Sequence, residues 1–170
     1  MIKRTGPETE KRESPGNLEF RKAGAADAGI LVGIYDAAFY SDYIRYGECP
    51  AYGRSLEMME RSILDYPKFL ILCRGRPVGC VSCRETEKGT YEVGCLCVIP
   101  EYQGKGIGTS AMEFVRARYP DWNRLTLVTP ADKTENIRFY TEKCGFEIRS
   151  FETDGQVKVA QFVLEKKSGE

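Results

Sequence analysis

The chain has no histidine among its 170 residues. Hydrolases that rely on a Ser-His-Asp triad or a Cys-His pair are therefore excluded, because both arrangements use an imidazole as the general base. Any proton transfer must use a carboxylate, a lysine, a tyrosine, a cysteine, the backbone or water. A zinc site would also lack its usual nitrogen ligand, which leaves cysteine as the side chain to consider.

The chain also lacks the even cysteine count of a disulfide scaffold, since it has seven. Cys80 and Cys83 form one C-x-x-C pair, the spacing with which a zinc site begins, but no second such pair follows. The pair lies in an apparent strand, where an odd offset directs the two sulfurs to opposite faces. Thiols packed as small apolar residues are favoured over a zinc site, and we predict no metal.

A net charge is missing as well: 25 Lys and Arg balance 25 Asp and Glu. A dedicated nucleic-acid binder carries a basic excess that meets phosphates, so we predict no nucleic-acid partner. No uncharged apolar run approaches the roughly 20 residues that cross a bilayer, and the N-terminus has no apolar signal-peptide core. We therefore expect no membrane partner and a cytoplasmic location.

What is present fits one domain. The length suits a single core, and 42% hydrophobic with 29% charged residues is typical of a globular protein. Residues 1–17 are charged and rich in Gly and Pro, so we expect a disordered tail there, and a shorter tail at 166–170. The folded domain is predicted to span 18–165.

The hydrophobic patterns predict strands at 18–22, 68–74, 76–85, 91–99, 124–128, 146–152 and 157–164. They predict helices at 27–40, 55–64, 106–119 and 133–144, with a loop over 41–53. Asp27 is expected to cap the first helix, and Asp132 with Glu135 to form a capping box on the last one, which Gly145 should end in a left-handed conformation. This order predicts a mixed α/β (α+β) domain.

The most informative segment is a glycine-rich turn between a strongly apolar strand and an amphipathic helix. Glycines at 104, 106 and 108 let the backbone adopt positive φ and approach a ligand. The unpaired N–H groups of a helix N-terminus suit a phosphate, and Lys105 adds a full charge. The spacing fits neither the Rossmann nor the P-loop pattern, and the turn alone leaves open a plain connection without a ligand.

Two motifs then match one family. Residues 103–108 (Q-G-K-G-I-G) resemble the Q/R-x-x-G-x-G/A signature of the GNAT superfamily of N-acetyltransferases. Residues 136–140 (N-I-R-F-Y), followed by Gly145 and Phe146, are similar to that family's N-x-x-x-Y…G-F segment. The element order agrees, so the resemblance covers about residues 18–164. It implies a single mixed, mainly antiparallel sheet flanked by about four helices, and an enzyme that transfers an acetyl group from acetyl-CoA to a primary amine.

The resemblance also implies where acetyl-CoA would bind. Its pyrophosphate would lie on the amides of the glycine turn, and its pantetheine arm would pair with the end of the preceding strand. The Leu96 N–H would polarise the thioester carbonyl. Asn136 would hydrogen-bond the cofactor or cap locally, and both roles stay open. The predicted cofactor-binding residues are Leu96, Cys97, Val98, Gln103, Gly104, Lys105, Gly106, Gly108, Thr109, Asn136 and Phe139.

Two side chains are predicted to move protons. Tyr140 resembles the family's tyrosine that protonates the departing thiolate, and the alternative is a core aromatic. Glu92, 11 residues before Gln103, lies where histone-acetylating members carry a glutamate base, and the alternative is a strand residue that faces solvent. A Cys97 nucleophile is the other mechanism, but nothing obvious lowers its pKa. Direct attack by the amine in a ternary complex is therefore predicted.

The acceptor side is predicted around the segment between the first two helices. Tyr40, Asp42, Tyr43 and Glu48 offer aromatic walls and carboxylates that suit a small cationic amine. The alternative is a loop whose tyrosines cover the core. The expected partner is a small-molecule or peptide amine of undetermined identity, and a homodimer is common in the family.

Two further functions remain open from the sequence. A non-catalytic acyl-CoA-binding or sensing domain would keep the glycine turn but would need neither Tyr140 nor Glu92. A nucleotide-binding α/β domain would use the same turn for ATP or NAD.

Overall fold

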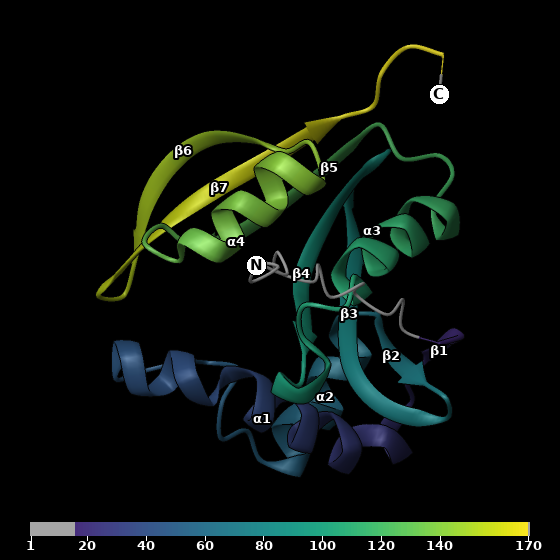
Figure 1. Cartoon of the computed structure of the whole chain (residues 1–170), viewed down its shortest axis with the longest axis vertical. Helices are drawn as coiled ribbons and strands as arrows, with labels where there is room; N and C mark the ends of the chain where they lie inside the picture. The colour runs from purple at the N-terminus through teal and green to yellow at the C-terminus, as the bar shows by residue number, and fades with distance from the viewer. Residues whose placement is uncertain (1–15, 170) are drawn as a thin grey trace, which may run out of the picture.

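The computed structural model describes residues 16–169, so nearly all of the predicted tail at 1–17 lies outside the described residues. One sheet of seven strands organises the described chain, in the order β1-β2-β3-β4-β5-β7-β6 (Figure 1). The strands are β1 (Leu18–Lys22), β2 (Lys68–Cys73), β3 (Arg76–Glu87), β4 (Thr90–Val98), β5 (Arg124–Pro130), β6 (Glu147–Asp154) and β7 (Val157–Glu165). Every neighbouring pair is antiparallel except β4 and β5, which confirms the mixed, mainly antiparallel sheet.

Four α-helices accompany the sheet within residues 16–169: α1 (Ala28–Tyr46), α2 (Leu56–Asp65), α3 (Ile107–Arg118) and α4 (Thr134–Arg138). A π-helical turn (Phe139–Lys143) continues α4, and short 3₁₀ turns occupy Ala25–Asp27 and Pro100–Tyr102. The predicted element order is confirmed. None of the helices in the described range has the length and apolar character that crossing a membrane requires.

Both faces of the sheet are covered around β2, all six residues of which are buried. On one face, the Tyr35 hydroxyl of α1 lies 3.9 Å from the sulfur of Cys80. On the other, Phe114 of α3 stacks on Phe20 with ring centroids 4.4 Å apart and meets Phe69 edge-on. A strand buried on both faces typically has a continuous apolar run, as β2 does after Lys68.

The sheet opens between β4 and β5, and this opening positions the site. The two strands pair only where Thr90–Glu92 face Arg124–Thr126. Beyond that short ladder, β4 continues to Val98 beside β3 while β5 continues to Pro130 beside β7. Figure 1 shows the two strands diverging, with α4 lying over the part of the sheet that contains β5 and β7. One edge of β4 is therefore left without a neighbouring strand.

A bulge at Gly94 bends β4 where the opening begins. Cys83 faces Val93 and Ser82 faces Cys95, so Gly94 has no partner on β3. The ring of Tyr66 occupies the space beside it, since a Cβ at position 94 would lie 2.5 Å from the Tyr66 Cζ atom. Only glycine fits this contact.

Two predictions about helix ends were wrong: the end of the first helix and the capping box of the last one. Contacts between residues distant in sequence decide both. The first helix continues past Tyr40 to Tyr46 and ends at Gly47 (φ +74°), so the first part of the predicted loop is helical. The predicted capping box at Asp132 and Glu135 does not form: Lys133 occupies the N-cap position without a side-chain cap bond.

The expected caps at Asp27 and Gly145 had different outcomes. Asp27 stands at the N-cap of α1, but its carboxylate accepts the N–H of Gly24 and binds Arg21 instead of capping the helix. Gly145 has φ +79°, as predicted, and the next N–H, of Phe146, donates to the Tyr140 carbonyl at 2.9 Å. Lys166, assigned to the C-terminal tail, donates its backbone N–H to Asn123.

Candidate active site

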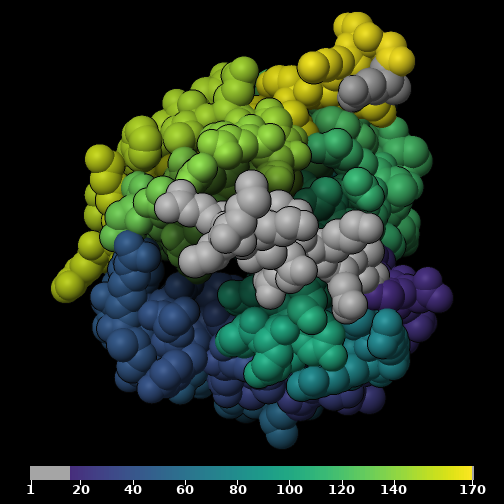
Figure 2. All heavy atoms as spheres, viewed as in Figure 1, coloured from purple at the N-terminus to yellow at the C-terminus, as the bar shows by residue number. Residues whose placement is uncertain are grey.

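A cavity of about 430 Å³ occupies the opening between β4 and β5. Its walls come from α1, β4, the glycine turn, the start of α3, β5 and the α4–π-helical segment. In the space-filling view, the blue atoms of the N-terminal helices lie at the lower left of this face, and the yellow-green atoms of the α4 region lie above them (Figure 2). The predicted site residues that line the cavity are Asp42, Leu96, Cys97, Val98, Gln103, Gly104, Gly106, Gly108, Thr109, Asn136, Phe139 and Tyr140.

The glycine turn closes one end of the cavity. Gly104 (φ +74°) and Gly106 (φ +83°) are both left-handed, a conformation that other residues adopt at a cost. Gly106 is also the N-cap of α3. The first N–H groups of the helix therefore lie next to it and have no hydrogen-bond partner within the helix. No atom lies within 4 Å of a Cβ placed at either position, so backbone conformation and not crowding requires glycine there.

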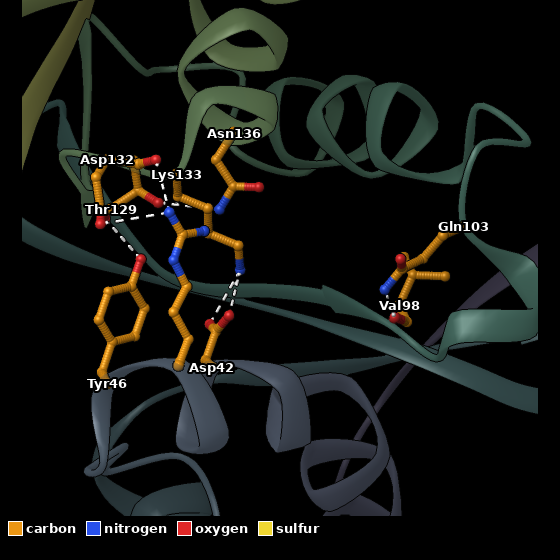
Figure 3. Close-up of polar contacts among 9 residues, drawn as sticks. Asp42, Tyr46, Val98, Gln103, Thr129, Asp132, Lys133 and Asn136 are labelled. Atoms are coloured by element: carbon orange, nitrogen blue, oxygen red, sulfur yellow. Dashed lines mark hydrogen bonds and ion pairs between the residues drawn. The ribbon is translucent and has the colours of Figure 1, made fainter.

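Gly108 serves a different purpose from the two glycines before it. A Cβ at this position would lie 3.0 Å from the Phe139 ring, so the missing side chain lets α3 and the π-helical turn approach each other. Gln103 holds the other side of the turn, because its amide N–H donates to the Val98 carbonyl at 2.9 Å (Figure 3). Lys105 lies outside the cavity, with its ammonium 5.3 Å from the Tyr102 ring centroid.

The free edge of β4 presents backbone groups to the cavity. The Ile99 N–H donates to Val78 on the β3 side, whereas the Val98 carbonyl accepts from Gln103 on the other side. Backbone groups alternate along a strand, so the Leu96 N–H points to the same open edge as those of Val98. The open edge therefore offers unpaired donors and acceptors to an extended ligand.

Tyr140 lies in the π-helical turn with only 8% of its surface exposed. Its ring packs edge-on against Phe139 and Phe146 and at a tilt against Phe162, while the residue also lines the cavity. Burial raises the pKa of the Tyr140 hydroxyl above its ordinary value. Tyr140 therefore packs in the core and also borders the cavity, so its position is compatible with both sequence interpretations.

Asn136 lines the cavity beside Tyr140 but is already partly engaged. Its amide N–H donates to the Thr129 hydroxyl at 3.0 Å, which ties α4 to the end of β5 (Figure 3). The capping role is not observed, because no side chain caps α4. The Asn136 carbonyl oxygen has no hydrogen-bond partner within residues 16–169 and is free to meet a ligand amide.

Glu92 is not among the residues that line the cavity. Its Oε1 atom accepts the Tyr66 hydroxyl at 3.0 Å and the Arg84 guanidinium at 3.3 Å. The same Tyr66 hydroxyl also donates to the Glu92 backbone carbonyl at 2.8 Å, and the Tyr66 ring covers Gly94, which does line the cavity. Burial, followed by the nearby Glu92 carboxylate, raises the pKa of Tyr66.

The predicted acceptor residues separate into one inside the cavity and three outside. Asp42 is buried in the wall, and both carboxylate oxygens accept from the Lys133 ammonium, at 2.8 and 3.0 Å. Tyr40 and Tyr43 are exposed and pack on Tyr52 away from the cavity. Glu48 lies beside the β6–β7 turn, where its carboxylate accepts from the Gln156 N–H.

A set of polar contacts joins the last turns of α1 to the connection between β5 and α4, and we call it the clasp (Figure 3). Asp42 binds Lys133, the Tyr46 hydroxyl donates to the Asp132 carboxylate at 2.7 Å, and Arg45 donates to the Asp132 carbonyl at 3.0 Å. These bonds explain both errors about the helix ends. They stabilise the extra helical turns of α1, and they engage the Asp132 carboxylate, which therefore does not cap α4.

Residues 16–169 contain no group of three or more His, Cys, Asp or Glu residues that could hold a metal ion. A model of the acetyltransferase (GNAT) family matches residues 37–146, which include the second half of α1, the glycine turn and Tyr140. The chain belongs to the GNAT family of acetyltransferases.

Two solved acetyltransferase structures have the same fold. An acetyltransferase from Thermus thermophilus matches with a TM-score of 0.73 and 20% identity, over 90% of this chain and 99% of that one. The PaiA N-acetyltransferase from Thermoplasma acidophilum, solved in complex with coenzyme A, matches with a TM-score of 0.69 and 18% identity, over 85% and 98% of the two chains.

A closer relative in sequence covers less of the chain. The uncharacterized protein YrkN from Bacillus subtilis (strain 168) is 39% identical over 82 residues, which span 48% of this chain and 44% of that protein. This GNAT chain therefore matches less than half the length of that relative.

Sequence reasoning missed several residues of this GNAT cavity. Lys133 was assigned only to a helix start, and Cys95 received no role, yet both line the cavity. Tyr66 was not singled out either, although a glycine inside an apolar strand signals the close approach of another group, here the Tyr66 ring. The partner of Lys133 is distant in sequence, so no local pattern indicated that contact.

Proposed function

We propose that this protein transfers an acetyl group from acetyl-CoA to a primary amine by direct attack within a ternary complex. One observation carries the proposal: a single cavity is lined at the same time by the glycine turn before α3, by the unpaired edge of β4 and by Tyr140. In this proposal the glycine turn binds phosphate, the β4 edge pairs with an amide-containing arm, and Tyr140 donates a proton, all within one cavity. Membership of the GNAT family supports the same activity.

The residues fit acetyl-CoA at both ends of the cavity. The open N–H groups of the turn and of the α3 N-terminus suit a diphosphate, with the Thr109 hydroxyl as a further donor. The free β4 edge suits the amides of the pantetheine arm, which would pair with Leu96 and Val98 as a strand does. The Asn136 carbonyl oxygen offers one more acceptor.

The Leu96 N–H is proposed to polarise the thioester carbonyl. A donor fixed in a strand costs no reorganisation when negative charge develops on the carbonyl oxygen. The amine nitrogen attacks the thioester carbon, the carbon–sulfur bond breaks, and the departing sulfur takes a proton from Tyr140. Since its pKa is raised, Tyr140 holds that proton at neutral pH.

The attacking amine must lose a proton, because an alkylammonium with a pKa of about 10.4 is mostly unreactive at neutral pH. Glu92 does not reach the cavity directly, so we propose that it receives the proton through the Tyr66 hydroxyl or through water. Tyr66 contacts both the Glu92 carboxylate and Gly94 in the cavity wall. In this proposal Glu92 acts as the base through a relay and not by direct contact with the amine.

The Glu92→Gln enzyme is expected to lose about 10²-fold in kcat, because the amide cannot take up the amine's proton. Tyr66→Phe should lower kcat similarly, and the double variant should be little worse than either single one, since the two groups act as one relay. Steady-state kinetics of CoA release measures all three. Glu87→Gln, at the exposed end of β3, is the matched control. Wild-type rates in Glu92→Gln would place the base elsewhere.

A panel of amines tests the proposed function. The panel contains a polyamine, an amino acid, an aminoglycoside and a peptide with a free amine, and the readout is free CoA thiol. We expect thiol release that requires both acetyl-CoA and at least one amine class. Acetyl-CoA that raises the melting temperature without any thiol release would indicate a binding domain. Stabilisation by ATP or NAD but not by acetyl-CoA would indicate a nucleotide-binding domain.

A further inference from the structure

Three thiols share one face of the sheet beneath α1. Cys80 faces Cys97 directly across β3 and β4, and Ser82 faces Cys95, so residues two apart on each strand place all three cysteines on the same face. Tyr35 covers this face, with its hydroxyl 3.9 Å from the Cys80 sulfur. Cys95 and Cys97 both line the cavity; Cys97 and Cys80 are buried, and Cys95 is half-buried.

A buried lysine stands in line with Cys95. Lys68 on β2 faces Ser82, which in turn faces Cys95, so the three residues form one row across three strands. Lys68 is only 3% exposed, and within residues 16–169 its ammonium makes no hydrogen bond or ion pair. The Tyr66 ring centroid lies 5.3 Å from this ammonium. A buried ammonium without a carboxylate is costly, and a thiolate on the same face would offset that cost.

A second cation lies beside Tyr35, the side chain that covers these thiols. The guanidinium of Arg54 lies 5.4 Å from the Tyr35 ring centroid. Cys95 is therefore a half-buried cysteine in the cavity wall within an electropositive group of side chains, a setting in which reactive cysteines are found. The groups near it are Tyr35 from α1, Arg54 before α2, Lys68 on β2, Cys80 on β3, Cys97 on β4 and Tyr140 from the π-helical turn.

These neighbours affect the thiols unequally. Interaction with the Cys97 thiol lowers the pKa of Cys95, and the Tyr35 hydroxyl, Lys68 and Arg54 lower it further against the opposing effect of burial. By contrast, burial raises the pKa of Cys83 to about 12 and that of Cys144 to about 11. Burial lowers the pKa of Lys68, and the adjacent Cys80 and Cys95 oppose that change.

We propose that Cys95 is a modification site, a thiol in the cavity wall that hydrogen peroxide oxidises to a sulfenic acid. The Cys95 thiolate attacks one peroxide oxygen, a sulfur–oxygen bond forms, and the oxygen–oxygen bond breaks. The departing hydroxide takes a proton and leaves as water, so the sulfur is oxidised and the peroxide reduced. The added oxygen projects from the wall next to Leu96 and obstructs the space proposed for acetyl-CoA.

The full-length protein is treated with hydrogen peroxide and a cyclic 1,3-dione that traps sulfenic acids, and labelled peptides are quantified by mass spectrometry. Cys95 should be labelled at least about tenfold faster than Cys49, which is also partly exposed but lies outside the cluster. Cys49→Ser should retain the labelling and Cys95→Ser should lose it. Equal or faster labelling of Cys49 would overturn the proposal.

Variants that remove a nearby positive charge test whether Cys95 reacts because of its cationic neighbours and not only because it is accessible. Lys68→Met should slow Cys95 labelling about tenfold and Lys68→Arg should preserve it, with thermal melting as the check on folding. Arg54→Gln provides a second variant, with a smaller slowing expected. Unchanged labelling in folded Lys68→Met and Arg54→Gln proteins would contradict the cationic support of Cys95.

Whether oxidised Cys95 blocks acetyl-CoA binding can be measured without following amine transfer. Saturating coenzyme A should protect Cys95 from the dione label, and the peroxide-treated protein should bind acetyl-CoA at least about tenfold more weakly in calorimetry. Unchanged affinity after complete Cys95 oxidation would refute the obstruction. A failed amine screen alongside clear Cys95 labelling would refute the transferase proposal alone.

Discussion

Replacing Tyr140 by Phe is expected to lower kcat by about 10²- to 10⁴-fold, the usual contribution of a general acid. The affinity for acetyl-CoA should stay nearly unchanged, because the ring keeps its contacts with Phe146 and Phe162 and only the hydroxyl is lost. Single-turnover kinetics, together with calorimetric binding of acetyl-CoA, separates the two quantities.

Tyr119→Phe makes the same chemical change away from the cavity and serves as the control, with an unchanged kcat expected. An equal loss of binding and rate in Tyr140→Phe would show that the hydroxyl holds the cofactor and does not donate a proton. Full activity would leave Tyr140 as a core aromatic. A raised pKa keeps Tyr140 protonated through neutral and mildly alkaline pH, so the wild-type rate should not fall there through loss of this acid.

The second large effect is expected at the glycine turn, where Gly106→Asp should weaken acetyl-CoA binding by about 10²-fold or more. The side chain of Asp adds a negative charge where the α3 N-terminus would meet a diphosphate, and like charges a few ångströms apart repel by roughly 1–4 kcal/mol. Isothermal titration calorimetry at two salt concentrations measures the loss, which should shrink as salt rises.

Gly106→Asn is the matched variant, since Asn has the same shape as Asp, carries no charge and tolerates a left-handed backbone equally well. The open space around position 106 admits either side chain. Gly106→Asn should therefore lose much less affinity than Gly106→Asp. Equal losses in the two variants would mean that shape and not charge is responsible, and unchanged binding in both would argue against a diphosphate at this turn.

Much of the fold was predictable because its strongest signals are local. The apolar run of β4, the turn glycines and the left-handed Gly145 each follow from a few adjacent residues, and the predicted order of elements is correct. The errors arose where distant contacts decide the structure. The predicted loop after Tyr40 continues as helix because Asp42 and Tyr46 bind the β5–α4 connection.

The site was predictable to the extent that a family motif specifies it. Residues of the glycine turn and of the N-x-x-x-Y segment line one cavity, as the two motifs together implied. The acceptor side has no such motif, and three of its four predicted residues lie outside the cavity: Tyr40 and Tyr43 pack on Tyr52, and Glu48 lies past the end of α1 beside the β6–β7 turn. The Lys68–Ser82–Cys95 row depends on strand register, which no single segment encodes.

The short ladder joins β4 to β5 where their gap begins, and the clasp joins α1 to the connection that follows β5. Under the proposed function, these two links are expected to limit the thickness of an acceptor that enters the cavity more than its length. The ion pair of the clasp is mostly shielded from water, because only 11% of the Asp42 side chain and 17% of the Lys133 side chain are exposed. Dissolved salt therefore screens the attraction between these two groups only weakly. Under the proposed function, changes in the last turns of α1 are therefore expected to alter which acceptors bind without changing the proposed catalytic groups.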